Sequence, residues 1–192
     1  MPAAAAAGIQ VIQRFTGGGT VVVDGDTLFA SLILAAADAP GVEPFPQPIM
    51  RWTERLYAAV FGRYGAFALR ENDYVLGPRK FGGNAQAITR GRWLHHTSFL
   101  WDFDPARMAL LAHPPRAPQY RAAREHGDFV TRLRDVAPHR PAVLADVAAS
   151  LRRLGFDVRP ASLEEAEAHL ALDHLRGNRL VDLAAAGAAA WP

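Results

Sequence analysis

The sequence predicts an α+β domain in which a largely antiparallel β-sheet is flanked by helices. Three observations lead to this prediction. Strand-like runs, either alternating apolar with polar residues or rich in β-branched residues, occupy 9–34 and 66–103. Apolar residues recur at helical spacing over 49–61 and over most of 141–175. Strands and helices do not alternate one by one, as a parallel βαβ sheet requires, so we expect antiparallel pairing.

Composition excludes several classes of protein. The chain has 192 residues, half of them hydrophobic, and a formal net charge of +2, which suits one domain with a sizeable core. The sequence has neither the run of positive charge typical of nucleic-acid binding nor an apolar stretch long enough for a membrane span. It has no cysteine, which excludes disulfides, cysteine metal sites and a thiolate nucleophile. We expect a monomer that binds neither nucleic acid nor membrane.

The first third of the chain is predicted to form an antiparallel meander. Residues 9–15 and 20–23 are typical of strands, and three glycines separate them. Asp24 and Gly25 favour a hairpin turn, because such turns need positive φ. A third strand is then expected over 27–34.

A proline-rich loop over 39–48 separates this meander from the first predicted helix. That helix covers about 49–61, and Gly62 is expected to end it. Four further strand-like runs are predicted over 66–70, 73–76, 79–89 and 92–103.

The last third of the chain is predicted to be mainly helical. Pro105 opens a short helix, and a longer one begins at Pro141 and stops before Gly155. A short strand is expected over 156–159. The run Ser162-Leu163-Glu164-Glu165 is a capping box, which predicts a helix that reaches about residue 175.

These elements predict four regions along the chain. Residues 1–8 are expected to be disordered, and residues 9–140 to form the core domain. The C-terminal helices follow over 141–177, and 178–192 is predicted to be a frayed tail.

The first candidate site is the segment from Arg14 to Thr20, with its three consecutive glycines. Glycines let backbone N–H groups approach an anion, because no Cβ intervenes. An arginine beside them suits a phosphate or a carboxylate. A plain hairpin turn is the alternative, and the segment taken alone favours it.

The second candidate site is Lys80 with Gly82, Gly83 and Asn84. A lysine near a flexible glycine pair can hold negative charge that develops on an acyl or phosphoryl oxygen. The Asn84 amide can bond a nucleotide or a metal-bound water. The alternative is a surface lysine that protects an edge strand from aggregation. That alternative is weakened because Lys80 is the only lysine in a chain that otherwise uses arginine.

Histidines and aspartates supply weaker candidates. His95 and His96 are consecutive strand residues, so they point to opposite faces and cannot easily share a metal. Each taken singly is expected to be structural. Asp24 and Asp26 are placed where they could lie near Mg²⁺, although Asp-Gly turns also use aspartate for local hydrogen bonds. No metal site is predicted.

Taken together, three segments resemble the lipoate–protein ligase family, within the group that also contains biotin ligases and octanoyl transferases. The matching runs are RFTGGGTVVVD from Arg14, RKFGGNAQ from Arg79 and WLHHTSFL from Trp93. The likeness covers roughly residues 9–135 and is closest to the plant-type branch of the family. It implies the biotin/lipoate ligase-like catalytic fold for the core domain.

The resemblance implies a role for each segment. Members of the family join a carboxylate to AMP and then pass the acyl group to a lysine of a carrier domain. Lys80 would be the catalytic residue, contacting the acyl carbonyl and the α-phosphate. The implied acyl- and phosphate-binding residues are Arg14, Thr16, Gly17, Gly18, Gly19 and His96, and the implied nucleotide-binding residues are Gly82, Gly83, Asn84, Ala85 and Gln86.

The resemblance also implies substrates and a partner. Lipoate or octanoate and ATP with Mg²⁺ would be the small-molecule substrates, with no tightly bound metal. The acceptor would be the lipoyl carrier domain of a 2-oxoacid dehydrogenase or of a glycine cleavage protein. The expected compartment is the cytoplasm or an organellar matrix, since the sequence shows no targeting segment.

Three activities stay open for such a chain. It can be an ATP-using ligase, an ATP-independent lipoyl transferase that starts from acyl-AMP, or a non-catalytic member. The last possibility arises because the family places more strands and a helix ahead of Arg14, so we expect an N-terminal truncation. A cysteine thioester mechanism is excluded by the lack of cysteine, and the Gly-Arg-Gly-Arg-type loop of biotin ligases is absent.

Overall fold

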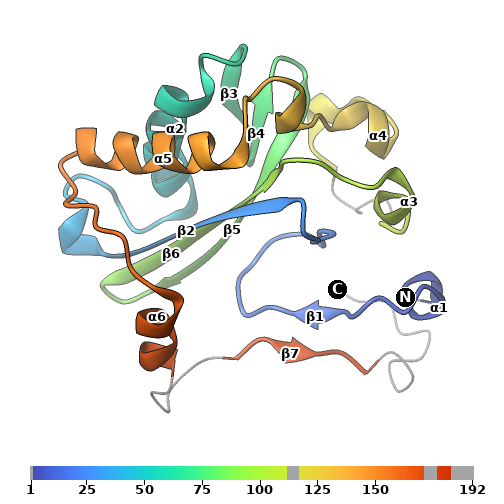
Figure 1. The fold of residues 1–192 in the computed structure, drawn as a ribbon, viewed down its shortest axis with the longest axis horizontal. Helices are drawn as coiled ribbons and strands as arrows, with labels where there is room; N and C mark the ends of the chain where they lie inside the picture. The colour runs from blue at the N-terminus through green and yellow to red at the C-terminus, as the bar shows by residue number, and fades with distance from the viewer. Residues whose placement is uncertain (1, 112–116, 171–176, 183–192) are drawn as a thin grey trace. The chain divides into compact units, whose positions relative to one another are not determined.

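The computed structural model describes residues 2–111, 117–170 and 177–182 (Figure 1). The chain divides into two compact units. The larger unit spans residues 18–158, and the smaller one combines residues 1–17 with residues 159–192.

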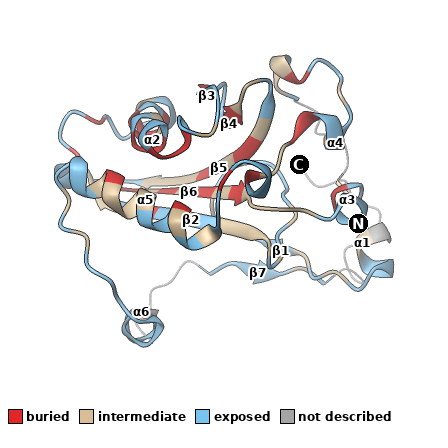
Figure 2. Cartoon of the chain, turned by 45° about the horizontal axis from the view of Figure 1, so that its top comes forward, coloured by how far each residue is buried: buried red, intermediate tan, exposed pale blue. Residues whose placement is uncertain are grey.

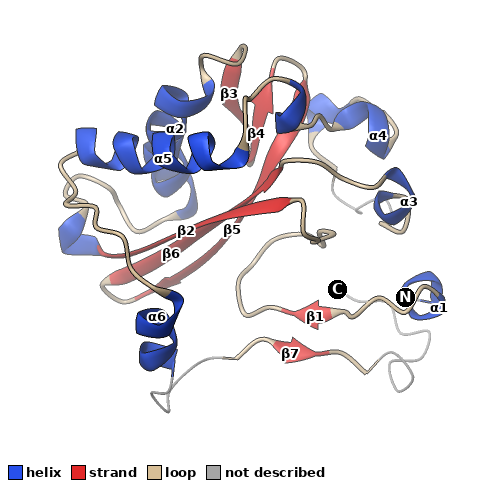
Figure 3. Ribbon diagram, in the orientation of Figure 1, coloured by secondary structure: helices blue, strands red, loops and turns tan. Residues whose placement is uncertain are grey.

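A five-stranded antiparallel sheet forms the centre of the larger unit, with strand order β2-β6-β5-β4-β3 (Figure 3). The strands are β2 Thr27–Ala35, β3 Phe67–Arg70, β4 Asp73–Leu76, β5 Arg79–Thr89 and β6 Arg92–Leu100. The predicted α+β class with a largely antiparallel sheet is therefore confirmed.

Two long helices, α2 (Pro46–Phe61) and α5 (Arg140–Arg153), cover one face of this sheet. Helix α2 starts earlier than its apolar pattern predicts, because proline is tolerated in the first turn, where no intrahelical N–H bond is lost. The Ser150 hydroxyl of α5 donates to the Leu56 carbonyl of α2 at 2.8 Å. No helix in the described part of the chain is long and apolar enough to cross a bilayer.

The core lies between α2 and the sheet, where buried residues gather in Figure 2. The Tyr57 ring meets Tyr74 and Phe99 edge-on, with centroids 5.0 Å apart in both pairs. Residues of β6 alternate between two faces. The face toward α2 and α5, called the helix face below, carries the buried residues Trp93, His95, Thr97 and Phe99. The opposite face, called the second face, carries Leu94, His96, Ser98 and Leu100.

Gly82 lies on the helix face, directly opposite Phe99. A Cβ built at position 82 would lie 2.9 Å from Phe99 Cδ1 and 3.3 Å from Tyr74 Cβ. Gly82→Ala is therefore expected to overpack the core and lower the free energy of unfolding by about 1–3 kcal/mol. Denaturant unfolding measures this, with Gly127→Ala as the control, because a Cβ at position 127 meets no atom within 4 Å. Equal stability of Gly82→Ala and wild type would contradict the expectation.

Short elements complete the larger unit. They are the helices α3 (Pro105–Met108) and α4 (His126–Phe129) and the 3₁₀ turns η1 (Ala36–Asp38), η2 (Gln119–Arg121) and η3 (Leu133–Asp135). Asp104 caps α3 by accepting from the Ala106 N–H at 2.8 Å.

The smaller unit contains α1 (Pro2–Ala6), β1 (Ile12–Gln13), α6 (Leu163–Leu170) and β7 (Arg179–Leu180), with β1 antiparallel to β7. The capping box predicted at the start of α6 is confirmed. The Ser162 N–H donates to Glu165 Oε2 at 2.6 Å, and the Glu165 N–H donates to Ser162 Oγ at 3.1 Å. The predicted end of this helix, at about residue 175, lies outside the described residues.

The predicted N-terminal meander is wrong. Residues 20–23 are not a strand, and β2 pairs with β6 over its whole length instead of forming a hairpin. Gly25 has no positive φ, whereas Asp24 makes the local bond expected of a turn aspartate, accepting from the Asp26 N–H at 2.9 Å. Pairing with the nine-residue β6 lets Leu28, Leu32 and Leu34 of β2 pack against the core on the helix face, which a two-strand hairpin alone cannot provide.

Three further local expectations differ from the structure. A short helix occupies residues 2–6 where disorder was expected, and β7 lies at the start of the expected tail. The strand predicted over 156–159 does not form. The rest of the expected tail, residues 183–192, lies outside the described residues.

Candidate functional site

Lys80 lies near the start of β5, where the pairing of β5 with β4 is irregular. The register shifts after Tyr74, so β5 has one more residue than β4 between Lys80 and Gly82. That extra residue, Phe81, is fully buried in the core. The Lys80 side chain instead lies over Gly83, which faces away from the helices. A bulge of this kind redirects a side chain without ending the strand.

The Lys80 ammonium is held by a carboxylate. Its Nζ lies 2.7 Å from Oδ1 of Asp73, the first residue of β4, and the two side chains are 25% and 11% exposed. An ion pair this far from solvent is weakly screened. The ammonium has three N–H donors, and the part of the chain that the structure describes offers it no second polar partner. Lys80 therefore has N–H donors that are available to form hydrogen bonds with an incoming anion.

Tyr120 completes this cluster from a different part of the chain. Its hydroxyl donates to Asp73 Oδ2 at 2.9 Å, so each carboxylate oxygen has its own partner. Burial, together with the nearby charge of Asp73, raises the pKa of Tyr120 well above its usual range. The hydroxyl therefore keeps its proton and acts only as a donor to the carboxylate.

Sequence reasoning missed Asp73 and Tyr120. Asp73 had a signal, since a charged residue at the start of an otherwise buried strand is unusual. Tyr120 follows a proline-rich segment, and no pattern in the sequence indicates that it belongs to a site.

The glycine pair beside Lys80 provides space. Neither Gly82 nor Gly83 has a positive φ, and both lie within β5, so neither needs the backbone conformation that only glycine adopts easily. A Cβ at Gly83 would lie 3.3 Å from Lys80 Nζ and 3.4 Å from its Cε. The lysine tip can lie this close to the β5 backbone because position 83 has no side chain.

The two histidines point to opposite faces, as predicted. His95 is fully buried on the helix face, and its Nδ1 accepts from Gln86 Nε2 at 2.9 Å. Burial, and to a lesser extent the charge of His96, lowers the pKa of His95 to about 4. His95 is therefore a neutral structural residue. His96 lies on the second face, with its Nδ1 2.6 Å from Ser31 Oγ and its ring 4.6 Å from the Phe29 ring.

Asn84 lies on the other face of the sheet from the Lys80 side chain. It pairs with Thr97, whose hydroxyl donates to Asn84 Oδ1 at 2.9 Å. Its Nδ2 donates to the Asn72 carbonyl at 2.9 Å. Both polar atoms of the amide therefore have protein partners, and its contact with a nucleotide stays a prediction.

Gln86 and Ala85 lie on different faces of β5. Gln86 shares the helix face with His95, and its Nε2 also lies 3.3 Å from the Pro46 carbonyl. Ala85 pairs with His96 on the second face. Of the predicted site residues on β5 and β6, Lys80, Gly83, Ala85 and His96 share the second face, whereas Gly82, Asn84 and Gln86 face the helices. The predicted roles of all seven remain predictions.

The triple-glycine segment is divided between the two units. Arg14, Thr16 and Gly17 belong to the smaller unit, and Gly18 and Gly19 belong to the unit that carries Lys80. Only Gly18, at φ 119°, needs the conformational freedom of glycine. Burial lowers the pKa of the Arg14 guanidinium. The acyl and phosphate roles of this segment remain predictions.

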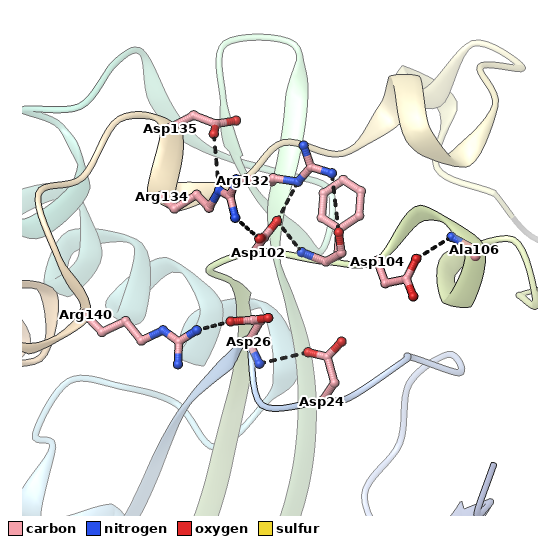
Figure 4. A network of polar contacts seen from close by, with 10 residues as sticks. Asp24, Asp26, Asp102, Asp104, Ala106, Arg132, Arg134, Asp135 and Arg140 are labelled. Atoms are coloured by element: carbon pink, nitrogen blue, oxygen red, sulfur yellow. Dashed lines mark hydrogen bonds and ion pairs between the residues drawn. The ribbon is translucent and has the colours of Figure 1, made fainter. Parts of the chain in front are cut away.

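Asp24 and Asp26, which from the sequence could lie near Mg²⁺ or make local hydrogen bonds, interact with arginines and backbone groups (Figure 4). Asp26 forms an ion pair with Arg140, and Asp24 accepts from the Asp26 N–H. Asp102, next to them in Figure 4, pairs with Arg134. The described residues contain no group of three or more histidine or acidic side chains that could hold a metal ion.

Comparison with known proteins identifies the family. The model of the lipoyl protein ligase A/B catalytic domain matches residues 1–153. The inactive lipoate–protein ligase 2 of Plasmodium falciparum (isolate 3D7) is 30% identical over 160 residues, which cover 66% of this chain and 41% of that protein. The chain thus spans less than half the length of this relative.

Solved structures agree on the fold. A bipartite lipoate protein ligase studied with its E2 lipoyl domain, from Thermoplasma acidophilum, has a TM-score of 0.69 at 21% identity, covering 87% of this chain and 66% of that one. A lipoate-protein ligase A bound with ATP has a TM-score of 0.67 at 20% identity, covering 88% of this chain and 68% of that one. The fold expected from the three sequence segments is confirmed, and the chain belongs to the lipoyl protein ligase A/B catalytic domain family.

Proposed function

We propose that this chain is the catalytic core of a lipoate–protein ligase-like enzyme. It joins lipoate or octanoate to AMP and passes the acyl group to a lysine of a lipoyl carrier domain. The observation that carries this proposal is the Lys80 ammonium, fixed on one side by Asp73 and lying over the bare backbone at Gly83. Membership of the ligase family supports it.

Both chemical steps build negative charge that Lys80 can stabilise. In the first step, a carboxylate oxygen of the acid forms a bond to the α-phosphorus of MgATP, and pyrophosphate leaves. In the second step, the carrier amine attacks the acyl carbonyl, and AMP leaves with the bonding electron pair. Fixed N–H donors beside the α-phosphate and the acyl oxygen lower both barriers without a covalent enzyme intermediate.

The acyl chain would lie along the second face of the sheet. Phe29 is 46% exposed there, its ring contacts His96, and Ala85 lies next to His96 across the strand pair. These side chains offer an apolar wall with one polar group. Mg²⁺ would arrive with ATP, since this ion is commonly bound through substrate phosphates and retained waters.

The test is incubation of the full chain with lipoate, MgATP and an apo lipoyl domain. We expect AMP to form and the carrier to gain the mass of one lipoyl group. Release of no AMP and no change in carrier mass would overturn the proposal.

A second candidate is a transferase that accepts preformed lipoyl-AMP. The name of the Plasmodium falciparum relative, which calls that protein inactive, supports a chain without ATP-dependent ligation, and this applies equally to a transferase and to a non-catalytic member. Supplying lipoyl-AMP without ATP separates the two candidates. Carrier acylation from lipoyl-AMP alone, with none from lipoate and ATP, supports the transferase. Failure of both reactions supports a non-catalytic member.

We also propose the acceptor class and the compartment. The acceptor is the lipoyl domain of a 2-oxoacid dehydrogenase or a glycine cleavage protein. The Thermoplasma acidophilum ligase was studied together with its E2 lipoyl domain, which supports this class of acceptor. The site of action is the cytoplasm or an organellar matrix.

Gly83→Ala is expected to impair the reaction while leaving the fold intact. The new Cβ would crowd the flexible end of Lys80, at 3.3 Å from its Nζ, and would meet Ser98 Oγ at an ordinary contact distance of 3.7 Å, so the lysine moves and the core does not. We expect the free energy of unfolding to change by less than about 1 kcal/mol, since surface changes are usually small. Carrier acylation should fall about tenfold or more, because a displaced donor fits the transition state less well. Unchanged acylation would show that the lysine position is not critical.

A further inference from the structure

Tyr120 belongs to a segment, residues 119–131, that is attached to the Lys80–Asp73 pair at two points. At its end, the Thr131 N–H donates to the Lys80 carbonyl at 2.8 Å, and Val130 forms a parallel bridge with Lys80. At its start, the Tyr120 hydroxyl reaches Asp73 Oδ2. The segment therefore contacts the lysine through the backbone and its counter-ion through a side chain.

Local interactions fix the Tyr120 ring firmly. Arg124 donates to the Tyr120 carbonyl at 2.9 Å, and the Phe129 ring lies 5.1 Å from the Tyr120 ring. Ala122 and Ala123 both adopt left-handed backbone angles, at φ 50° and 57°. Such angles are unfavourable for alanine and persist only where surrounding contacts impose them.

We propose that Tyr120 is a positioning residue for Lys80 and acts through Asp73. Because its hydroxyl occupies Oδ2, the carboxylate offers only Oδ1 to the ammonium. The lysine is thus held at one point, over Gly83, with its other donors directed away from the carboxylate. The catalytic meaning of this arrangement rests on the proposed function, whereas the effect on Lys80 itself does not.

Loss of the hydroxyl has a defined consequence. Without it, Asp73 loses a donor that shares its negative charge, and both carboxylate oxygens become available to Lys80. The ammonium is then held more strongly by the carboxylate and moves toward it. Its nitrogen should become less reactive, and its fit to a substrate anion should worsen.

The other charged groups facing Tyr120 stay the same in a hydroxyl deletion. Glu71 accepts from the Tyr120 N–H at 3.3 Å, Arg70 lies 5.9 Å from the ring centre, and Arg124 bonds the Tyr120 carbonyl. None of these three contacts uses the hydroxyl oxygen. A change in Lys80 reactivity can therefore be traced to the bond with Asp73.

The test uses Tyr120→Phe in the full chain, and Lys80 makes it unusually direct. Lys80 is the only lysine in the sequence, so an amine-reactive ester labels it and the N-terminal amine alone, and peptide mass spectrometry separates the two. The rate of Lys80 labelling is followed as a function of pH. Tyr64→Phe is the matched control, because the Tyr64 hydroxyl has no hydrogen-bond partner among the described residues.

We expect Tyr120→Phe to slow Lys80 labelling about tenfold near neutral pH and to move the labelling profile to higher pH, with Tyr64→Phe unchanged. A tenfold change corresponds to about the free energy that one hydrogen bond to a charged group contributes. A labelling profile identical to that of wild type would overturn the proposal. Thermal unfolding of both variants checks that the fold is retained.

A double-mutant cycle tests whether Tyr120 acts through Asp73. Asp73→Asn removes the carboxylate charge, and in that background Tyr120→Phe should have no further effect on labelling. Additive effects of the two changes would mean that Tyr120 does not act through Asp73.

Acyl transfer gives a separate readout. If wild type is active, Tyr120→Phe should lower kcat about tenfold and leave KM for lipoate nearly unchanged. If wild type is inactive, the proposed function fails, and the labelling experiment still decides the role of Tyr120.

Discussion

Lys80→Ala is expected to reduce the rate of lipoate transfer to a carrier domain by about 10²–10³-fold, the usual cost of removing one fixed donor to a developing oxyanion. The ammonium is a positive charge on the second face, positioned by Asp73, and the described residues offer no lysine to replace it. Single-turnover kinetics with saturating lipoate and MgATP measure the loss. Affinity for the carrier should stay the same.

Arg79→Ala is the matched control for this variant. It removes a cation from the neighbouring position, where the side chain is exposed, and should leave the rate within about twofold, as expected of a surface change. Lys80→Arg should restore little activity, since a planar guanidinium pairs with a carboxylate through two parallel bonds and does not place a compact charge over Gly83. Full activity of Lys80→Ala would remove the observation on which the proposed function stands.

Strand alternation predicted part of this site and failed at one residue. It placed His95 and His96 on opposite faces correctly, because β6 is regular. Strict alternation would also put Lys80 and Gly83 on opposite faces, since they are three positions apart. The extra residue at Phe81 reverses that relation and brings the lysine over the glycine. A bulge has no signal in a single sequence, because it depends on the partner strand.

Long-range contacts explain the remaining gaps. The ranges of β3, β4 and β5 follow from local patterns and were predicted closely, because short hairpins join these strands. The partner strand of β2 was not predicted correctly. The choice between a hairpin with a neighbouring segment and pairing with the distant β6 depends on how much apolar surface each pairing buries against the helices. The contact between Tyr120 and Asp73 spans 47 positions and has no periodic signature. The plant-type branch suggested by the sequence stays a prediction.

His95 should make the stability of the larger unit fall in mild acid. Its pKa is about 4 in the folded chain, because the ring is buried, against about 6.5 in an unfolded chain. Above pH 6.5 both states are neutral and the full stability is present. Between pH 6.5 and pH 4 the unfolded state binds a proton that the folded state does not bind, so unfolding becomes progressively easier. The loss over this window is on the order of 3 kcal/mol.

Denaturant unfolding at several pH values between 7 and 4 measures this effect, and comparison with His95→Gln isolates it from the titration of carboxylates. The glutamine variant should be less stable than wild type at pH 7, because the bonds around Gln86, Thr53 and Tyr74 are disturbed. It should nevertheless lose less stability on acidification. His96→Gln, on the second face, is the control. If His95 is the main group that binds the proton, this variant should lose as much free energy of unfolding between pH 7 and pH 4 as the wild type does. If the free energy of unfolding of His95→Gln falls with pH as steeply as that of wild type, another group binds the proton, and the buried His95 imidazole does not determine the stability of this fold in acid.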